Sequence, residues 1–227
     1  YNVLEYKDGV SFFGSSTGWE SKVEMGKGRS MGIEFIAQKT LGKTTGWLSY
    51  TLSKSDRKFA KGAINNGERF PYKYDRRHNI NLTLNHKFSE RIDIGASWVF
   101  YTGGTSTIPE EKTTIIRPGN GANNGFILGF DNYYNPIYNN SPNVGEANYI
   151  EHRNNYRLPA SHRLNIGINF NKKTKHGMRI WNISLYNAYN SMNPAWVFRS
   201  HNDDGKSVIK KYTLLPCIPS FTYTYKF

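Results

Sequence analysis

The hydroxyl, imidazole and carboxylate side chains of this sequence do not form a recognisable catalytic motif. Ser161 and Ser200 each precede a histidine, but neither lies in the Gly-x-Ser-x-Gly turn that presents a nucleophilic serine. The six histidines show neither His-Glu-x-x-His nor another paired spacing typical of zinc. Asp203-Asp204-Gly205 offers oxygen ligands for Ca²⁺, but this triplet is far more typical of a plain turn. We therefore expect no enzyme, no metal site and no cofactor.

Two further reactive features also favour structural interpretations. Glu110 and Glu111 directly follow Pro109, which is typical of a solvated loop. Cys217 is the only cysteine, so it has no partner for an internal disulfide, and it matches no metal-ligand spacing. We expect Cys217 to pack as a small apolar residue in a late strand-like segment.

A long segment rich in Asn and Gly carries better candidates for ligand binding. Aromatic rings stack on the apolar faces of sugars and peptides, while amide groups bind their polar edges. Tyr133, Tyr134 and Tyr138 are therefore candidate ligand-binding residues. The alternative, that these rings pack only against their own loop, stays open. The aromatic residues of the segment are Phe126, Phe130, Tyr133, Tyr134, Tyr138 and Tyr149.

Composition excludes two other classes of protein. The formal net charge is +13, but Lys and Arg are scattered in ones and twos and no nucleic-acid-binding motif accompanies them. Hydrophobic residues make up 37% of the chain, and no apolar run approaches the ~18–20 residues of a membrane helix. The abundance of Tyr, Phe, Asn and Gly instead favours short strands joined by turns.

The elements that must position these residues follow a period of two, which is typical of β-strands. In one segment Ile80, Leu82 and Leu84 alternate with Asn79, Asn81 and Thr83. Most segments are about ten residues long, the length of a transmembrane strand rather than of a strand in a soluble sandwich. The predicted strands are Arg29–Lys39, Gly46–Lys54, Asn79–Phe88, Arg91–Tyr101, His162–Phe170, Arg179–Asn190 and Phe221–Phe227.

The two faces of these strands differ in chemistry, as expected for an antiparallel transmembrane β-barrel with a wet or plugged lumen. One face of each strand is apolar, and the other is rich in Asn, Ser, Thr and Gly. We expect Ile80, Leu82, Leu84, Ile92, Ile94, Leu164, Ile166 and Ile168 to face lipid. We expect Asn79, Asn81, Thr83, Asp93, Arg163 and Asn165 to face the lumen.

Aromatic residues gather near the strand ends, where amphipathic rings favour membrane interfaces. These residues are Trp47, Tyr50, Phe88, Trp98, Phe100, Tyr101 and Tyr189. Ordinary core packing is the alternative explanation for them.

Short and long connections alternate along the chain, as in outer-membrane barrels with short periplasmic turns and long external loops. A soluble sandwich that binds a ligand with loops at one end is the alternative. The short turns are Leu41–Thr45, Phe88–Arg91 and Asn171–Gly177; the long, irregular segments are Ser55–Asp75, Thr102–Ser161 and Ser191–Lys211. If the last strand runs toward the periplasm, Asp75, Arg77, Tyr101 and Arg163 lie near the outer mouth of the lumen. They are candidate ligand-binding residues or, equally, an ion-pair network that braces the wall.

Several short motifs, in this order, resemble the barrel of TonB-dependent outer-membrane receptors. They run over nearly the whole chain, and the last two resemble the penultimate and terminal strands of such receptors. The motifs are Gly18-Trp19-Glu20, the segments 26–34, 46–54 and 70–78, Leu185-Tyr186-Asn187-Ala188-Tyr189-Asn190, and the segment 219–227.

The resemblance implies that residues 1–227 are the C-terminal part of a receptor in the cell outer membrane. It implies import of a scarce, bulky nutrient: a metal chelate, cobalamin, an oligosaccharide or a peptide. The plug domain has no counterpart in this chain. The implied partners are outer-membrane lipid, the remainder of the barrel, the plug and, through the plug, TonB; a surface lipoprotein is a further candidate. A small complete outer-membrane barrel with a structural or adhesive role is the alternative, and an outer-membrane enzyme is a third hypothesis.

The number of strands argues against closure of a barrel by these residues alone. Bacterial barrels normally have an even number of strands, whereas seven are predicted here. The segment 1–10 is short, contains Glu5, Lys7 and Asp8, and begins at Tyr1 with no signal peptide. We interpret it as the upper end of a strand whose beginning is missing. Plugged transporters have about 22 strands, so we expect Phe221–Phe227 to pair outside this chain.

Overall fold

The computed structural model describes residues 1–7, 18–117, 127–130, 136–138 and 143–227. Within these ranges the chain is all-β, and every strand ladder is antiparallel. The helical segments among these residues are the short 3₁₀ turns η1 (Trp19–Lys22) and η2 (Ile64–Gly67). None of the helical segments in the described ranges is long and apolar enough to span a membrane.

The strands are β1 Asn2–Tyr6, β2 Val23–Lys39, β3 Thr44–Lys58, β4 Phe70–Pro71, β5 His78–Lys87, β6 Ile92–Tyr101, β7 Thr105–Ser106, β8 Glu111–Arg117, β9 Ile127–Phe130, β10 Pro136–Tyr138, β11 Asn143–Tyr149, β12 Tyr156–Arg157, β13 Ser161–Thr174, β14 Gly177–Tyr186, β15 Pro194–His201, β16 Ser207–Thr213 and β17 Ile218–Lys226. The chain divides into two compact units. One comprises Tyr1–Ile108 and His152–Phe227, and the other is Pro109–Glu151.

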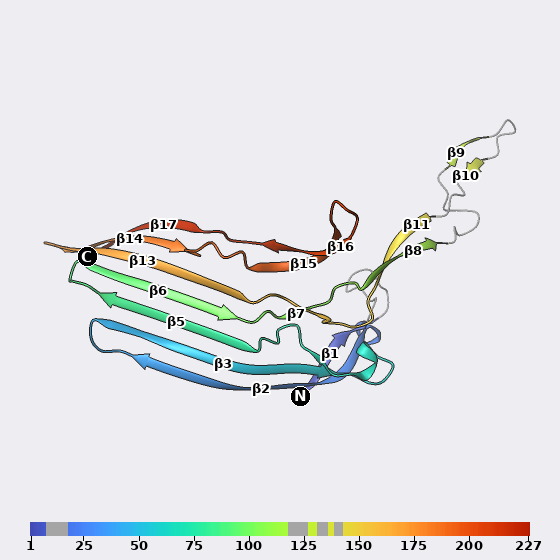
Figure 1. Ribbon diagram of the computed structural model, residues 1–227, viewed down its shortest axis with the longest axis horizontal. Coiled ribbons are helices and arrows are strands. Elements are labelled where there is room, and N and C mark those ends of the chain that lie inside the picture. Colours follow the sequence, from blue (N-terminus) through green and yellow to red (C-terminus); the bar gives the residue numbers. More distant parts are fainter. Residues whose placement is uncertain (8–17, 118–126, 131–135, 139–142) are drawn as a thin grey trace. The chain divides into compact units, whose positions relative to one another are not determined.

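The first unit contains one sheet whose long strands follow chain order (Figure 1). Its strand order is β1-β2-β3-β5-β6-β13-β14-β17, with β4 paired to the loop end of β3. All seven predicted strands are confirmed in it, as β2, β3, β5, β6, β13, β14 and β17. Several strands are longer than the alternating sequence predicts. For example, β2 and β3 pair as far as Lys27 and Lys58.

One predicted strand ends early. Arg179–Asn190 was expected to be extended throughout, but β14 stops at Tyr186. The next residue, Asn187, has a φ of 53° and is 1% exposed. Its side-chain amide donates to the carbonyls of Ser191 and Leu215, and its Oδ1 accepts the Ser191 N–H at 2.8 Å. Asparagine tolerates this left-handed conformation and offers the turn a local hydrogen-bonding partner, so the strand gives way to a turn.

The register places the two predicted sets of residues on opposite faces of the sheet. Leu82 lies opposite Leu48 and Trp98, and Trp98 lies opposite Leu164. These residues belong to an apolar row. The neighbouring row is polar: Thr83 lies opposite Ser97, and Ser97 lies opposite Asn165. We call these the apolar face and the polar face.

Two of the aromatic residues expected at a membrane interface lie on the polar face. Trp47 pairs with Thr83 and Gln38, and Tyr101 pairs with Asn79 and Ser161. Tyr50, Trp98 and Phe100 lie in apolar rows instead. A position near a strand end does not decide the face, and the membrane-interface location of these rings stays a prediction.

The described residues of the chain do not cover the apolar face. Ile33 is 73% exposed, Phe35 57% and Phe221 64%. The hydrophobic cluster of the unit is small and lies at the loop end of β2 and β3. It consists of Val3, Phe59, Ile64 and Phe70.

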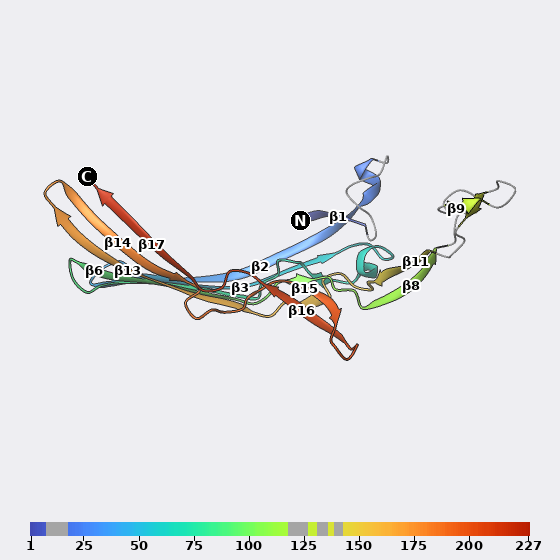
Figure 2. The ribbon, with the colours of Figure 1, turned by 90° about the horizontal axis from the view of Figure 1, so that it is seen from above.

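The two edges of the sheet are β1 and β17. Among the described residues, β1 pairs only with β2 and β17 only with β14. No closed barrel is present in this part of the chain. Figure 2 shows the sheet nearly edge-on, with β14 and β17 bending away from the plane of the central strands.

The long connections contain more regular structure than expected. Within the second unit β8 pairs with β11, and β9 pairs with β10. In the first unit β15 and β16 form a hairpin, and β7 pairs with β12. The expectation of irregular loops was therefore wrong for these segments, since two-residue alternation is weak in them and the pairing depends on partners farther along the chain.

Candidate functional site

Asp75 is the centre of an ion-pair cluster where the chain enters β5. Its side chain is 1% exposed. Its Oδ1 accepts the main-chain N–H of Ser55 at 2.6 Å, and its Oδ2 lies 2.6 Å from Nη2 of Arg157. Arg77 lies 3.8 Å from the same oxygen. The structure thus brings Asp75 and Arg77 together in one ion-pair network with Arg157.

Tyr101 and Arg163 are positioned separately. The Arg76 guanidinium lies 4.1 Å from the ring centroid of Tyr101. Arg163 lies 4.4 Å from the ring centroid of Tyr186 and donates to its hydroxyl. Among the described residues, no hydrogen bond or ion pair joins either of them to Asp75 or Arg77. The four predicted residues therefore do not form one constellation.

Asp56 is a second buried carboxylate that the sequence alone did not single out. Its side chain is 4% exposed and it forms ion pairs with Arg29, at 2.9 Å, and with Arg69. Burial raises the pKa of Asp56, but the hydrogen bonds and charges of Arg29 and Arg69 outweigh it, so the pKa lies below its ordinary value. The sequence did indicate its face: Leu52, Lys54 and Asp56 follow one another at intervals of two residues, and this spacing continues beyond the predicted strand end at Lys54.

The polar face carries a continuous set of amide hydrogen bonds near its turn end. The Asn169 and Asn171 amides donate to Asp93 at 2.7 and 2.6 Å, and the Asn182 amide donates to Asn169 at 2.7 Å. These side chains come from three neighbouring strands, so they fix one another across the sheet. Such a surface suits contact with water or with a polar solute.

A hollow of about 370 Å³ lies over the middle of the sheet. Gly95 and Gly167 pair in the register and line this hollow, close to the side chains of Asn85 and Ser184. The polar residues of the lining are Thr83, Asn85, Ser97, Asn165, Ser184 and Tyr186, beside Ala96, Ile166 and Leu185. Hydroxyl and amide groups can bind a polar solute there, and the lining residues include no histidine, lysine or carboxylate that could activate Ser97 or Ser184.

The candidate aromatic residues of the second unit are only partly placed. Tyr133 and Tyr134 lie outside the described residues. Tyr138 lies in β10, of which the strand and its pairing with β9 are described, but not the side chain. Ligand binding by these three residues stays a prediction.

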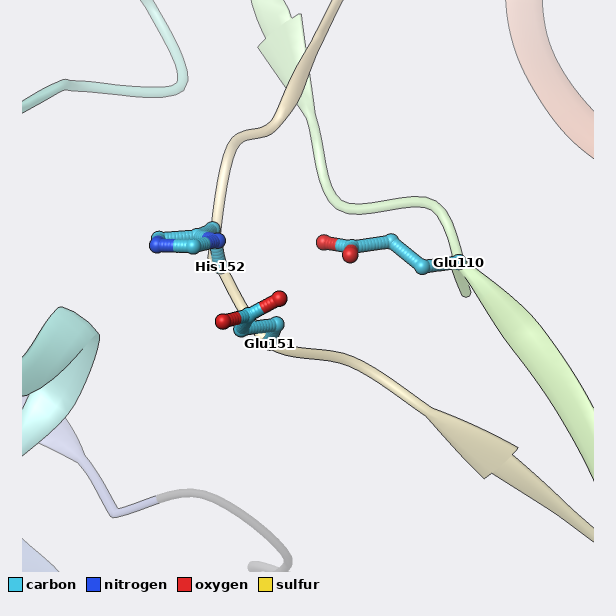
Figure 3. A group of neighbouring side chains, drawn as sticks. All are labelled: Glu110, Glu151 and His152. Carbon is cyan, nitrogen blue, oxygen red and sulfur yellow. The ribbon is translucent and has the colours of Figure 1, made fainter.

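Two carboxylates, Glu110 and Glu151, lie at the base of the β8–β11 ladder (Figure 3). Their oxygens are within 4.8 Å of each other, and Figure 3 also shows His152, the next residue of the chain. Acidic groups at the surface are common without an ion, so this pair gives no reason to assign a metal. Asp203-Asp204-Gly205 forms the turn of the β15–β16 hairpin, where the Gly205 N–H donates to the Asn202 carbonyl. The turn interpretation of that triplet is confirmed.

Aromatic side chains lie near both ends of the apolar face. At the loop end the indole N–H of Trp98 donates to the Tyr189 hydroxyl at 3.2 Å, and His162 lies 2.8 Å from that oxygen. At the turn end Trp181 packs 4.4 Å from Tyr223, between ring centroids. Rings with polar tips at both ends of an apolar surface are typical of a membrane-facing sheet.

Comparison with known proteins identifies no relative: no family model matches the chain, and no curated protein or solved structure matches it significantly.

Proposed function

We propose that this chain is the C-terminal part of the barrel of a TonB-dependent receptor in the outer membrane, which imports a scarce, bulky nutrient. The observation that carries the proposal is a meander of seven long antiparallel strands with one uncovered apolar face and one polar face. A soluble domain would bury the apolar face in its own core. Lipid can cover this apolar face without a further layer of protein.

The dimensions of the apolar face support the lipid assignment. On β2 the face is bounded by Arg29 at the loop end and Lys39 at the turn end. Ten residue steps at ~3.3 Å give roughly 33 Å along the strand. At a strand tilt of ~40° this corresponds to roughly 25 Å, the height of the apolar band in outer-membrane barrels. Met31, Ile33 and Phe35 occupy this band.

The polar face supports the assignment of a lumen. Asn, Ser, Thr and Gly line the hollow over Gly95 and Gly167, and the Asp93–Asn169–Asn182 network spans three strands. A lumen-facing wall of this kind leaves room for water, a plug or a passing solute. The substrate class is that implied by the resemblance: a metal chelate, cobalamin, an oligosaccharide or a peptide.

The arrangement of the edges favours a large receptor barrel over a small complete one. A complete barrel requires a ladder between its first and last strands. Between the described residues of β1 and β17 there is none, and the two strands lie at opposite edges of the sheet. In the proposed receptor the remaining strands complete the wall, the plug fills the lumen, and TonB acts through the plug.

Spin labelling of two adjacent positions tests the topology. Labels at Leu82→Cys and Thr83→Cys, in a Cys217→Ser background of the full-length protein, occupy opposite faces of the same strand. We expect the Leu82 label to be accessible to dissolved oxygen in the bilayer and the Thr83 label to a water-soluble nickel chelate. The reverse pattern, or equal access to both reagents, contradicts the membrane assignment.

Uptake measurements test the transport role. Cells that lack this protein should lose accumulation of one scarce, bulky nutrient, and cells that lack TonB should show the same loss. Normal uptake of every tested metal chelate, cobalamin, oligosaccharide and peptide would contradict the receptor proposal. Retention of the protein in the outer membrane would then favour a structural or adhesive role.

A further inference from the structure

The hollow over the middle of the polar face carries no charge. It has a volume of about 370 Å³, and its lining comes from β5, β6, β13 and β14. All of its lining residues belong to the described part of the chain, and none of them is a lysine, arginine, histidine, aspartate or glutamate. Asp93 lies beyond its turn end and Arg163 beyond its loop end. Two asparagine amides bind Asp93, and Arg163 donates to the Tyr186 hydroxyl, so both charges are already held by neighbours. The hollow therefore suits a neutral solute.

The polar side chains of the hollow are available to such a solute. Toward the turn end, the neighbouring amides of Asn169 and Asn182 already take part in a network with Asp93. Hydroxyl and amide groups both donate and accept hydrogen bonds, so they can exchange bound water for the hydroxyl groups of a ligand. A ligand with many hydroxyl groups complements this lining. In the described ranges, no hydrogen bond to another residue is made by the side chains of Thr83, Asn85, Ser97 and Ser184.

Trp47 adds an aromatic ring at one border of the hollow. It lies directly opposite Thr83 in the ladder of β3 and β5, so both side chains project from the polar face. Trp47 is 41% exposed, although it stands between the polar residues Thr83 and Gln38. Tyr186, which belongs to the lining, brings a second ring to the opposite border. Aromatic rings stack on the apolar faces of sugars, so rings beside a neutral, hydrogen-bonding hollow favour a carbohydrate ligand.

Two glycines keep the centre of the hollow accessible. Gly95 and Gly167 lie opposite each other in the ladder of β6 and β13. With no Cβ at either position, a ligand can approach the main chain there. A Cβ at Gly95 would lie 3.0 Å from Oδ1 of Asn85, so even a small side chain would take up part of the space. The volume is at the small end of the ~300–1,000 Å³ typical of ligand pockets, so the hollow accepts a short stretch of a sugar chain.

We propose that this hollow binds a neutral oligosaccharide that passes along the lumen wall. Trp47 stacks on the apolar face of a sugar ring, and the hydroxyl and amide groups of the lining bind the sugar hydroxyls. The inference rests on the proposed function, which makes the polar face the wall of the lumen, and it selects one of the nutrient classes given there. A metal chelate with ionised ligands or a zwitterionic peptide would find no opposite charge in the lining. The corrin ring of cobalamin is too large for a hollow of this size.

Uptake by cells that make only the tested variant of the full-length protein tests the subsite. The neutral probes are radiolabelled hexasaccharides of glucose, mannose and xylose; the other probes are hexagalacturonic acid, a ferric hydroxamate chelate, cobalamin and a hexapeptide. Trp47→Ala removes the ring. Gly95→Val fills the hollow with a good strand former, and the Cβ that it adds has only the movable Asn85 amide within 4 Å. Trp181→Ala is the matched control, because Trp181 is 43% exposed and lies on the apolar face.

We expect at least one neutral hexasaccharide to be taken up, and hexagalacturonic acid to be taken up poorly. Trp47→Ala should lower the maximal rate of this uptake about fivefold, as expected for the loss of one stacked ring. Gly95→Val should lower the rate at least as much. Trp47→Phe keeps a ring and should retain most of the rate, whereas Trp181→Ala should leave it unchanged. Heat-modifiable mobility measures the amount of each variant in the membrane, to which the rates are normalised.

Three results overturn the proposal: equal rates for Trp47→Ala and Trp181→Ala, equal rates for Trp47→Phe and Trp47→Ala, or uptake of only the charged probes or cobalamin. Each of them leaves the proposed function intact as long as some probe is imported in a TonB-dependent way. If the protein is absent from the outer membrane, or if uptake of no probe depends on it, the proposed function fails and the subsite fails with it.

Discussion

Arg157 binds Asp75 at two points, although the residues are 82 positions apart in the chain. Its Nη2 lies 2.6 Å from the Asp75 carboxylate, and its Nη1 donates to the Asp75 main-chain carbonyl at 2.7 Å. The same Nη1 donates to the Gly103 carbonyl at 2.9 Å. One side chain therefore ties the entry of β5 to the segment that follows β6.

We expect Arg157→Gln to destabilise the protein by about 2 kcal/mol, because the buried Asp75 carboxylate loses its closest cation and two carbonyls lose a donor. Urea unfolding of the purified protein in detergent measures this change. Arg77→Gln is the matched control, since Arg77 lies 3.8 Å from the same carboxylate, and its effect should be clearly smaller. Equal effects of the two substitutions would show that the close pair has no special role.

Leu82→Arg and Thr83→Arg should differ sharply. An arginine on the lipid face near the middle of the bilayer costs about 2–4 kcal/mol, whereas the lumen face accepts a charge. We expect Leu82→Arg to reduce folded protein in the outer membrane and Thr83→Arg to leave its amount near normal. Heat-modifiable mobility of membrane fractions measures both. Equal tolerance at the two positions would contradict the assignment of faces.

Deletion of Phe227 should sharply reduce assembly of the full-length protein. Phe221, Tyr223, Tyr225 and Phe227 alternate in a terminal strand that resembles the signal read by the outer-membrane assembly machinery. Phe227 is fully exposed in the structure, so its loss removes no core packing. The amount of heat-modifiable protein in the membrane is the measurement. An unchanged amount would count against the signal.

Replacement of Tyr133, Tyr134 and Tyr138 by Ala should weaken substrate binding and leave the barrel folded. The expected cause is loss of ring surface that stacks on the ligand. Binding is measured on whole cells with labelled substrate, and unchanged mobility of the folded band is the control. Unaltered affinity would show that these rings only pack their own loop.

Stability should fall in acid in a way that depends on Asp56. Arg29 and Arg69 hold the pKa of Asp56 below its ordinary value of 3.8. The carboxylate therefore stabilises the fold above that ordinary value, and the contribution is lost as the pH falls through the lower pKa of the folded state. Unfolding of the purified protein between pH 5 and pH 2 should show a smaller loss of stability in Asp56→Asn. Parallel curves for the two proteins would refute this role.

The pattern of neighbouring residues is enough to predict the strands and their faces. A period of two needs only neighbouring residues, and it separates Leu82 from Thr83 wherever the strand pairs. Short turns then fix the hairpins β2–β3, β5–β6 and β13–β14, whereas the long connections leave open how these hairpins pair with one another. The same local pattern placed Arg163 and Asn165 on the polar face.

The relationships between distant segments become visible only in the folded chain. β6 and β13 pair although the whole second unit separates them in the sequence, and no local pattern encodes the register of this pairing. The sequence predicts a loop at Asp56, whereas in the fold Asp56 lies in β3 directly opposite Arg29. The Asp75–Arg157 pair likewise joins residues 82 positions apart, and the Asn187 amide reaches the Leu215 carbonyl. Such contacts arise when the folded sheet brings the partners together, so they leave no periodic trace in the sequence.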